Sequence, residues 1–303
     1  MLPSAGHQTL SYLQRRFAEA GVHPKARHGQ NFLIDLNLLR VLVDSAKVGP
    51  NDVVLEVGAG TGSLTVQLAK QAAWVVTVEI DPDMRRMAEE QLSSCRNITL
   101  IPYDALKNKN TINPRVLDAI AEQLAVSPER RFKLAANLPY NIATPLISNL
   151  LDLDRPPESM TITIQKELAD RMLAKPCTKD YGALSVWVQS QCDIEVARVL
   201  PPQSFWPRPK VTSAIITISV RDDRRRAIPD RKFFHQFVRS MFFHRRKLLR
   251  GELLSATKGH LDKPGVDALL ASMDLLPTAR AEELGVPQML ALCQAVQSAT
   301  GAV

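Results

Sequence analysis

Short apolar runs alternate with helical patterns over the first 220 residues, and this alternation constrains the fold more than any other feature. Residues 52–57, DVVLEV, have the pattern of a buried strand, and the turn GAGTGS and the helical pattern LTVQLAKQ follow directly. Five more runs have the pattern of strands: residues 74–80, 97–101, 131–137, 159–165 and 213–220. Strands that alternate with helices predict an α/β fold with a mostly parallel sheet.

Two domains are expected, because no strand pattern remains after about Pro229. We place the boundary near residue 224, with a catalytic domain over residues 1–224 and a small all-helical domain over residues 225–303. Residues 107–130 are polar and then helix-like, and are interpreted as an excursion between two strands. The four prolines of PPQSFWPRP, residues 201–209, exclude this segment from the interior of a helix or strand.

Composition narrows the class of protein. The 303 residues are 45% hydrophobic, without a run of the roughly eighteen apolar residues that a membrane helix needs. The N-terminus lacks the apolar core of a secretory signal, and the four cysteines lie far apart, as in a protein with reduced thiols. These features predict a cytoplasmic protein without a membrane partner.

Positive charge is concentrated in one segment. The chain has a net charge of +7, and residues 221–250 hold eleven basic and three acidic residues. The rest of the chain is therefore close to neutral. A basic block confined to one segment indicates a polyanionic partner such as RNA.

The turn after the first strand pattern has the spacing of a nucleoside site. Gly58, Gly60 and Gly62 lie between a strand and a helix, where glycine permits a sharp turn and a close approach by a ligand. The dinucleotide fingerprint needs a third glycine at position 63, where this chain has Ser63, and Glu56 precedes the turn. An adenosyl cofactor without phosphates fits this spacing better than a dinucleotide does.

Two acidic residues follow the next two strand patterns. Glu79 ends the second strand, where a carboxylate can accept both ribose hydroxyls, and Asp104 follows the third, in reach of an adenine amino group. With the glycine turn, they predict a site for S-adenosyl-L-methionine, with S-adenosyl-L-homocysteine as product and no metal. The alternative is that both acids cap the helices after them, although Asp81 already precedes the first of those helices.

The fourth strand pattern ends in Asn137, Leu138, Pro139 and Tyr140. Ligands of such sheets lie beyond the carboxyl ends of the strands, so Asn137 is expected to face the methyl group of the cofactor. Its side-chain oxygen and the carbonyl of Leu138 can accept from an adenine amino group, while Pro139 fixes the backbone. Tyr140 can stack on the base. The alternative is an ordinary turn.

A second aromatic residue, Phe205 or Trp206, lies on the proline-rich loop and could hold an unstacked base against Tyr140. The alternative is that these rings only fix the loop to the sheet.

The residues described so far resemble a known family, the small-subunit (16S) ribosomal RNA adenine N6-dimethyltransferases of the KsgA/RsmA type. The resemblance covers nearly the whole chain. It is carried by GQNFLID, VLEVGAGTGSLT, VEID, NLPYNIATP, IQKELADRMLAKP, YGALSV, FWPRPKVTSA and FVRSMFFHRRKLLRGEL.

The resemblance implies a Rossmann-like S-adenosylmethionine-dependent methyltransferase sheet with an N-terminal cofactor lid at about residues 20–36. The cofactor contacts that it implies are Asn31, Leu33, Gly58, Glu79, Asp104 and Asn137, to which the glycine turn adds Gly60. It also implies that Phe205 is the ring opposite Tyr140. The implied reaction is N6,N6-dimethylation of two adjacent adenosines near the 3′ end of 16S rRNA, within a precursor of the small ribosomal subunit.

Three features depart from the family pattern. His28 stands where the family usually has leucine, and Tyr103 where it usually has glycine. The segment from Asp104 to Asn137 is longer than expected. The first two departures concern cofactor affinity.

Residues 231–250 are predicted to form one amphipathic helix. At about 100° per residue, Lys232, Arg239, Arg246 and Arg250 fall on one face, which is expected to contact RNA. Arg245 falls on the apolar side, which indicates a helix break near His244 or a buried contact.

Two other functions are compatible with parts of the sequence. One is a large-subunit rRNA adenine N6-methyltransferase of the antibiotic-resistance type, which shares the chemistry but tends towards Asn-Ile-Pro-Tyr. The other is a ribosome-assembly RNA-binding factor with little activity, which would not need Glu79, Asp104 and Asn-Leu-Pro-Tyr together. The protein is expected to be monomeric.

Overall fold

The structure is a computed structural model and describes residues 9–25, 29–244, 247–257 and 259–301. The chain divides into two compact units. The first comprises the residues up to Ala169 together with Ile194–Val220, and the second comprises Asp170–Asp193 and the residues from Arg221 onward. The segment Asp170–Asp193 therefore groups with the C-terminal helices, although it precedes the boundary predicted near residue 224.

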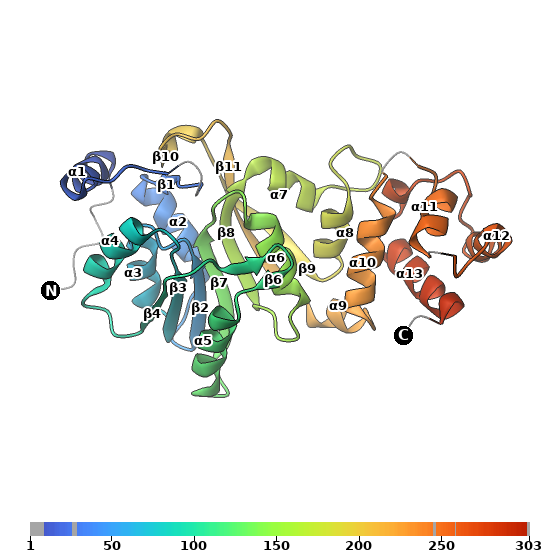
Figure 1. Ribbon diagram of the computed structural model, residues 1–303, viewed down its shortest axis with the longest axis horizontal. Helices are drawn as coiled ribbons and strands as arrows, with labels where there is room; N and C mark the ends of the chain where they lie inside the picture. Colours follow the sequence, from blue (N-terminus) through green and yellow to red (C-terminus); the bar gives the residue numbers. More distant parts are fainter. Residues whose placement is uncertain (1–8, 26–28, 245–246, 258, 302–303) are drawn as a thin grey trace. The chain divides into compact units, whose positions relative to one another are not determined.

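A seven-stranded sheet forms the centre of the first unit (Figure 1). Its spatial order is β4-β3-β2-β7-β8-β11-β9. The bounds are β2 Asp52–Val57, β3 Trp74–Val78, β4 Ile98–Ile101, β7 Arg131–Asn137, β8 Ser159–Gln165, β9 Cys192–Leu200 and β11 Ser213–Val220. The five strands β4, β3, β2, β7 and β8 pair in parallel, and β11 is antiparallel to β8. The predicted α/β fold with a mostly parallel sheet is confirmed.

Strand β9 was not predicted from the sequence. Its residues alternate between polar and apolar types, and most of them are exposed or half-buried at the edge of the sheet. An edge strand needs little apolar surface, so its sequence carries only a weak strand signal.

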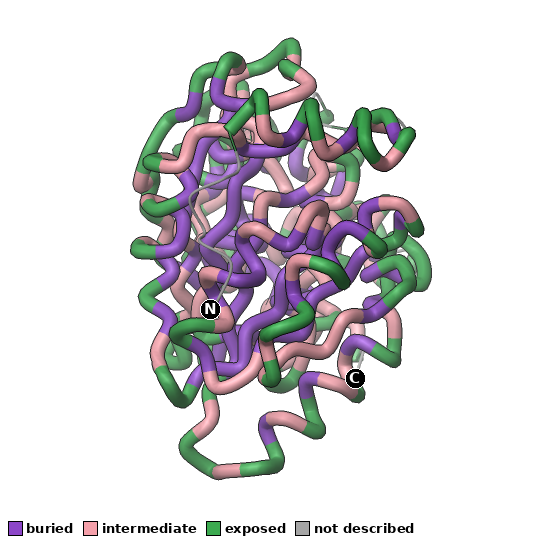
Figure 2. Tube along the Cα trace, turned by 90° about the vertical axis from the view of Figure 1, so that its left-hand side faces the viewer, coloured by how far each residue is buried: buried purple, intermediate pink, exposed green. Residues whose placement is uncertain are grey.

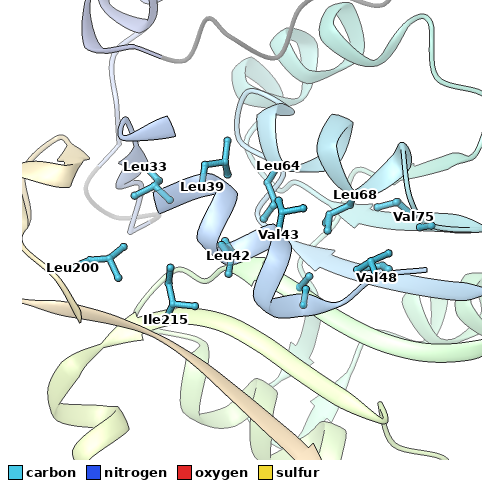
Figure 3. Packing of buried hydrophobic residues seen from close by; sticks show 14 of the residues in the cluster. Leu33, Leu39, Leu42, Val43, Val48, Leu64, Leu68, Val75, Leu200 and Ile215 are labelled. Atoms are coloured by element: carbon cyan, nitrogen blue, oxygen red, sulfur yellow. The ribbon is translucent and has the colours of Figure 1, made fainter. Parts of the chain in front are cut away.

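Six helices of the first unit lie between or before these strands. They are α1 Leu10–Ala20, α2 Leu36–Ala46, α3 Ser63–Ala69, α4 Pro82–Leu92, α5 Pro114–Ala125 and α6 Ala143–Asp152. Side chains from α2 and α3 pack on the sheet in one apolar cluster that includes Leu42, Leu68 and Ile215 (Figure 3). The strands are buried on both faces, as expected of a parallel sheet, and Figure 2 shows such buried stretches between exposed turns.

Two short antiparallel pairs complete the first unit. In one, β5 Leu106–Asn108 pairs with β6 Thr111–Ile112, within the predicted excursion between strands. In the other, β1 Phe32–Leu33 pairs with β10 Phe205–Trp206. The proline-rich loop was predicted to contain no strand, which is wrong for these two residues. Phe205 and Trp206 lie between prolines and keep their own backbone donors, so they can pair.

Helices make up most of the second unit. The bounds are α8 Ala183–Gln189, α9 Asp222–Arg226, α10 Arg231–Met241, α11 Leu249–Ala256, α12 Lys263–Ser272 and α13 Val286–Thr300, with a 3₁₀ turn at Ala281–Glu283. Helix α7, Lys166–Leu173, runs from the first unit into the second. The buried face of α10 consists of Phe234, Phe237, Val238 and Met241.

Residues 231–250 do not form a single helix, and the break near His244, one of the two alternatives that Arg245 indicated, is confirmed. Helix α10 ends at Met241, and α11 begins only at Leu249. One continuous helix would place Arg245 on the apolar face, and the interruption near His244 removes that conflict. The angular grouping of four basic residues on one face therefore does not hold.

Candidate active site

A cavity of about 410 Å³ opens at the carboxyl ends of β2, β3 and β7 in the first unit. It brings together ten of the predicted site residues: Asn31, Leu33, Gly58, Gly60, Glu79, Asp104, Asn137, Leu138, Pro139 and Tyr140. Five segments that are far apart in the sequence thus meet. Four of them lie at the ends of β2, β3, β4 and β7, because the carboxyl ends of parallel strands share one edge of the sheet, and the fifth contains Asn31 and Leu33.

The glycine turn forms one wall of this cavity. Gly58 and Gly60 have φ values of +88° and +56°, which lie in the left-handed region that favours glycine. The N–H groups of Gly58 and Ala59 donate to the Val78 carbonyl, at 2.8 and 3.1 Å. A Cβ on Gly60 would lie only 3.1 Å from the ring of Phe32. The turn is therefore held by the neighbouring strand and has no space for a side chain at position 60.

Glu79 is buried and fixed by the backbone. Its two carboxylate oxygens accept hydrogen bonds from Gly60 N at 2.8 Å and Asp81 N at 2.9 Å. Burial raises the pKa of this carboxyl, while these bonds oppose the increase. The N-cap of α4 is Asp81, whose side chain accepts from Asp83 N. Glu79 is thus a wall residue of the cavity and not the cap of the next helix.

Asp104 is exposed and lines the cavity after β4. Of the four strands β4, β3, β2 and β7, β4 lies at the end away from β7 and Asn137. Its Oδ1 accepts from Leu106 N at 2.9 Å and closes a short turn before β5. Neighbouring Tyr103 is 41% exposed, lines the same cavity, and stacks against the guanidinium of Arg115 at 4.3 Å. The departure at position 103 therefore adds an aromatic ring beside the predicted adenine position. His28, the other departure, lies outside the described residues.

Asn137 is oriented by the lid segment. Its Nδ2 donates to the carbonyl of Asn31 at 2.9 Å, so Oδ1 is the side-chain atom left to accept a hydrogen bond. Tyr140 is half-buried, and its hydroxyl lies 2.6 Å from Oγ of Ser213 on β11. Burial raises the pKa of this phenol. Both side chains thus have fixed positions at the cavity.

Phe205 does not lie opposite Tyr140. It is 2% exposed, belongs to the apolar cluster with Leu33 and Leu200, and is absent from the cavity wall. Trp206 packs edge-on against Phe17 with ring centroids 5.1 Å apart. The implied position of Phe205 as the second ring around the base is corrected here. The pairing of β10 with β1 turns Phe205 into the core, as in the alternative that these rings fix the loop.

The lid segment is tied to the start of α4 by charge. Lys25 Nζ lies 2.9 Å from Asp81 and 2.8 Å from Asp83, and Gln30 Nε2 donates to the other oxygen of Asp81 at 2.9 Å. Burial alone would raise the pKa of Asp81, but these hydrogen bonds and that from Asp83 N hold it below its usual value. This network ties the segment around Lys25 and Gln30 to the start of α4.

Three site residues carried little or no signal in the sequence. Glu56 was noted only as the acid before the turn, yet it lines the cavity with a buried carboxyl whose Oε2 accepts from Thr65 and Thr77. Ile80 is an apolar cavity residue that is 46% exposed. Ser213 binds Tyr140 from 73 residues away. The only sequence signal for Ser213 was its place at the start of the last strand pattern, which forms β11 and pairs with β8.

The predicted RNA-binding residues differ in their surroundings. Lys232 and Arg239 are exposed on α10, whereas Arg250 pairs with Asp267. Arg246 lies outside the described residues. The RNA-binding role of all four stays a prediction.

Comparison with known families agrees with this geometry. Residues 22–292 match the family of ribosomal RNA adenine dimethylases. The chain belongs to this family. The fold and the family resemblance predicted from the sequence are confirmed.

Relatives of this dimethylase are similar over nearly their whole length. One from Listeria monocytogenes, named ribosomal RNA small subunit methyltransferase A, is 39% identical over 87% of this chain and 88% of its own. A protein of the same name from Geobacillus thermodenitrificans is 38% identical over 92% of this chain and 93% of its own.

Two solved structures share the fold. The dimethyladenosine transferase of Plasmodium falciparum has a TM-score of 0.71 and 24% identity, and covers 88% of this chain and 97% of its own. The 23S rRNA methyltransferase ErmE has a TM-score of 0.61 and 25% identity, and covers 88% of this chain and 100% of its own.

The described part of this dimethylase contains no helix that is long and apolar enough to cross a membrane. Within the same residues, no three His, Cys, Asp or Glu side chains gather in a way that could hold a metal ion.

Proposed function

We propose that this protein transfers methyl groups from S-adenosyl-L-methionine to N6 of two adjacent adenosines near the 3′ end of 16S rRNA. The substrate would be a precursor of the small ribosomal subunit. The observation that carries the proposal is the anchored Asn137 in one cavity with Glu79 and Asp104. The small-subunit assignment is supported by the names of the relatives.

The residues around the cavity fit an adenosyl cofactor. Gly58 and Gly60 have left-handed backbones and no side chains, so a ligand can contact their main chain directly. At position 60 a Cβ would also be too close to Phe32. Glu79 is oriented by two backbone N–H groups and can still accept from ribose hydroxyls. Ile80 and Tyr103 offer exposed apolar and aromatic surface for an adenine ring, and Asp104 offers an acceptor for its amino group. When bound, S-adenosyl-L-methionine supplies an electrophilic methyl group on a positively charged sulfur.

The residues at the end of β7 would prepare the nucleophile. An adenine amino group is a poor nucleophile because its lone pair is delocalised into the ring. Asn137 Oδ1 and the Leu138 carbonyl can accept from its two N–H bonds, which favours a pyramidal nitrogen. A bound S-adenosyl-L-methionine would supply its methyl group to this lone pair, the electrons of the S–C bond would stay on sulfur, and the nitrogen would lose a proton to water. Asn137 and Leu138 thus act by position and electrostatics, without a general base.

Tyr140 would hold the base. Its ring lines the cavity, and its hydroxyl is fixed by Ser213, so the ring can stack on a base without losing further freedom. A base would have to leave its stack to reach this cavity. Because Phe205 is buried in the core, we do not assign it a stacking role.

Transfer of a labelled methyl group tests this function directly. Small-subunit precursors and large subunits from a strain that lacks the enzyme are incubated in parallel with the protein and labelled cofactor. We expect incorporation only in the small-subunit precursor, at two adjacent adenosines located by mass spectrometry. Incorporation in the large subunit would contradict the substrate assignment.

Asn137→Ala tests the mechanism. We expect its turnover to fall about 10²- to 10³-fold, the usual effect of losing one preorganised polar group that acts on the reacting centre. Cofactor affinity should fall less than turnover, because Asn137 is only one of the expected cofactor contacts and Glu79 and Asp104 remain. The matched control is Asn51→Ala, which alters an exposed asparagine outside the cavity. Equal turnover by Asn137→Ala and the wild type would refute the mechanism.

A further inference from the structure

A second cavity, of about 400 Å³, lies within the C-terminal unit. It is formed by α10, α11 and residues 243–244, and we call it the α10–α11 groove. Its wall includes Gln236, Arg239, Phe243, His244, Glu252 and Ser255. A volume of this size is typical of sites that bind small molecules or single groups of a larger ligand. The mechanism proposed above uses none of these side chains.

Glu252 is the unusual member of this groove. It is 2% exposed, and among the described residues its Oε1 is buried without a hydrogen-bond partner. Nδ1 of His244 lies 3.7 Å from Oε1, which is too far for a hydrogen bond. The side chain of His244 is half exposed, so it can turn away and let a ligand reach Oε1. A buried acceptor without a partner costs free energy that a ligand carrying a donor would recover.

Phe243 and Arg239 face the solvent at the same groove. Phe243 is 79% exposed, the largest exposed fraction among the large hydrophobic residues described. Arg239 is exposed in the last turn of α10. An aromatic ring, a cation and a buried acceptor are the three groups that an unpaired nucleotide needs, for its base face, its phosphate and its base edge.

We propose that the α10–α11 groove binds one unpaired nucleotide of the rRNA, with its base stacked on Phe243 and its amino group donating to Glu252. Arg239 contacts the adjoining phosphate. This inference rests on the proposed function, because it takes rRNA as the ligand. Adenine, guanine and cytosine can each donate to this carboxylate through an exocyclic amino group, whereas uracil offers only its ring N3–H.

RNA explains this groove better than a protein partner does. One side of the groove, from Gln236 to His244, belongs to the segment 221–250, which carries a net charge of +8. Five of its six named side chains are polar, and its aromatic ring is exposed at the groove and not packed in an apolar surface. Protein interfaces instead have an apolar centre from which charged residues are depleted.

Two variants of the full-length protein test the proposal. Phe243→Ala should weaken binding to the 3′ segment of 16S rRNA by about 5- to 150-fold, the loss expected for one base stack. Glu252→Met removes the acceptor but keeps the length of the side chain, and should weaken binding about tenfold. The double variant should lose little more than the weaker-binding single variant, because both side chains hold one nucleotide.

Glu252→Met also separates binding from folding. Replacing an unpartnered buried carboxyl by an apolar group should keep or raise the melting temperature while RNA affinity falls. The matched control for Phe243→Ala is Leu276→Ala, which removes another strongly exposed apolar side chain, 70% exposed, from the same unit. The control should bind RNA like the wild type.

Chemical probing identifies the bound base. Dimethyl sulfate and kethoxal modify the Watson–Crick edges of adenine, cytosine and guanine. One such base should be protected by the wild type and by Leu276→Ala, but exposed again by Phe243→Ala and by Glu252→Met. If the variants expose no base, the proposal is wrong. It is also wrong if they weaken binding to the precursor particle but not to naked rRNA, since the groove would then hold a protein.

The outcomes also distinguish this inference from the proposed function. If the wild type transfers methyl groups and binds rRNA, but neither variant changes rRNA affinity, only the groove assignment fails. If the wild type transfers no methyl group, but Phe243→Ala still loses rRNA affinity and base protection, the proposed function fails and the groove assignment stands.

Discussion

At the scale of single residues, two carboxyl groups of the cavity wall, those of Glu79 and Glu56, have different hydrogen-bond partners. Glu79 accepts two backbone hydrogen bonds, whereas Glu56 is held only by the hydroxyls of Thr65 and Thr77, and its Oε1 has no hydrogen-bond partner among the described residues. Burial raises the pKa of Glu56 from 4.5 to about 8. Glu56 therefore carries a proton at neutral pH and can donate or accept at the cavity wall.

This shift predicts how stability depends on pH. Between pH 4.5 and about 8 the folded protein keeps the Glu56 proton that the unfolded chain has lost. The Glu56 contribution to the free energy of unfolding is thus complete below pH 4.5, and decreases by at most about 1.4 kcal/mol per pH unit up to pH 8. Glu56→Gln should remove this slope, so the variant gains stability relative to the wild type as pH rises. Urea unfolding from pH 5 to 8.5 gives the free energy of unfolding of both proteins. If the two free energies change with pH in parallel, the pKa of Glu56 is not raised.

At the scale of elements, the site depends on how a turn and a lid pack on the ends of strands. The glycine turn is held by Val78 of β3, and the lid is held by Lys25 and Gln30 on Asp81 at the start of α4. Phe32 of β1 lies close to Gly60 and joins the two. A substitution at Gly60 should therefore disturb both the glycine turn and the segment around Phe32.

Gly60→Ala should be more harmful than the same change at Gly21. Both glycines have left-handed backbones, with φ of +56° and +65°, so alanine costs about 1–2 kcal/mol of stability at either position. Only at Gly60 would the new Cβ meet the Phe32 ring, whereas nothing lies within 4 Å at Gly21. We expect Gly60→Ala to lose more stability and most of its cofactor affinity, and Gly21→Ala to keep its cofactor affinity. Calorimetry of cofactor binding and thermal unfolding measure both, and equal losses would contradict the packing argument.

At the scale of the whole molecule, charge and its internal pairing decide how much of the basic segment is available to RNA. Residues 221–250 account for the whole net positive charge. Arg221 and Arg224 pair with Asp193, and Arg250 pairs with Asp267. The number of cations left without an acidic partner, and so available to phosphate, is therefore smaller than the eleven that the sequence counts.

Arg239→Glu should consequently weaken rRNA binding and lower its salt dependence. Each lost phosphate contact reduces the slope of log K against log salt by about 0.7–0.9. Cofactor affinity should not change, because Arg239 does not line the cofactor cavity. Filter binding between 50 and 300 mM salt gives the slope. Lys70→Glu, an exposed lysine of the first unit, makes the same charge change as a control. Equal slopes for Arg239→Glu and the wild type would exclude a phosphate contact at this residue.

Local patterns were sufficient for most of the sheet and for the polar residues at the strand ends of the cavity. The strands β2, β3, β4, β7, β8 and β11 and the N-cap Asp81 follow from apolar runs and capping residues, which act within a few positions along the chain. Residues at strand ends, such as Glu79 and Asn137, were predictable because parallel strands bring their carboxyl ends to one edge.

The sequence by itself thus determined the α/β fold, the family and the edge of the sheet where the predicted site residues meet. It also offered a helix break near His244 as one of two alternatives. Only the tertiary structure decided that Phe205 enters the core, that Ser213 fixes Tyr140, and that α10 and α11 form a groove around Glu252. The physical reason is how far apart along the chain the interacting residues lie. Strand and helix patterns reflect neighbours along the chain, whereas burial, hydroxyl pairing and groove formation depend on partners that only the packing of distant segments supplies.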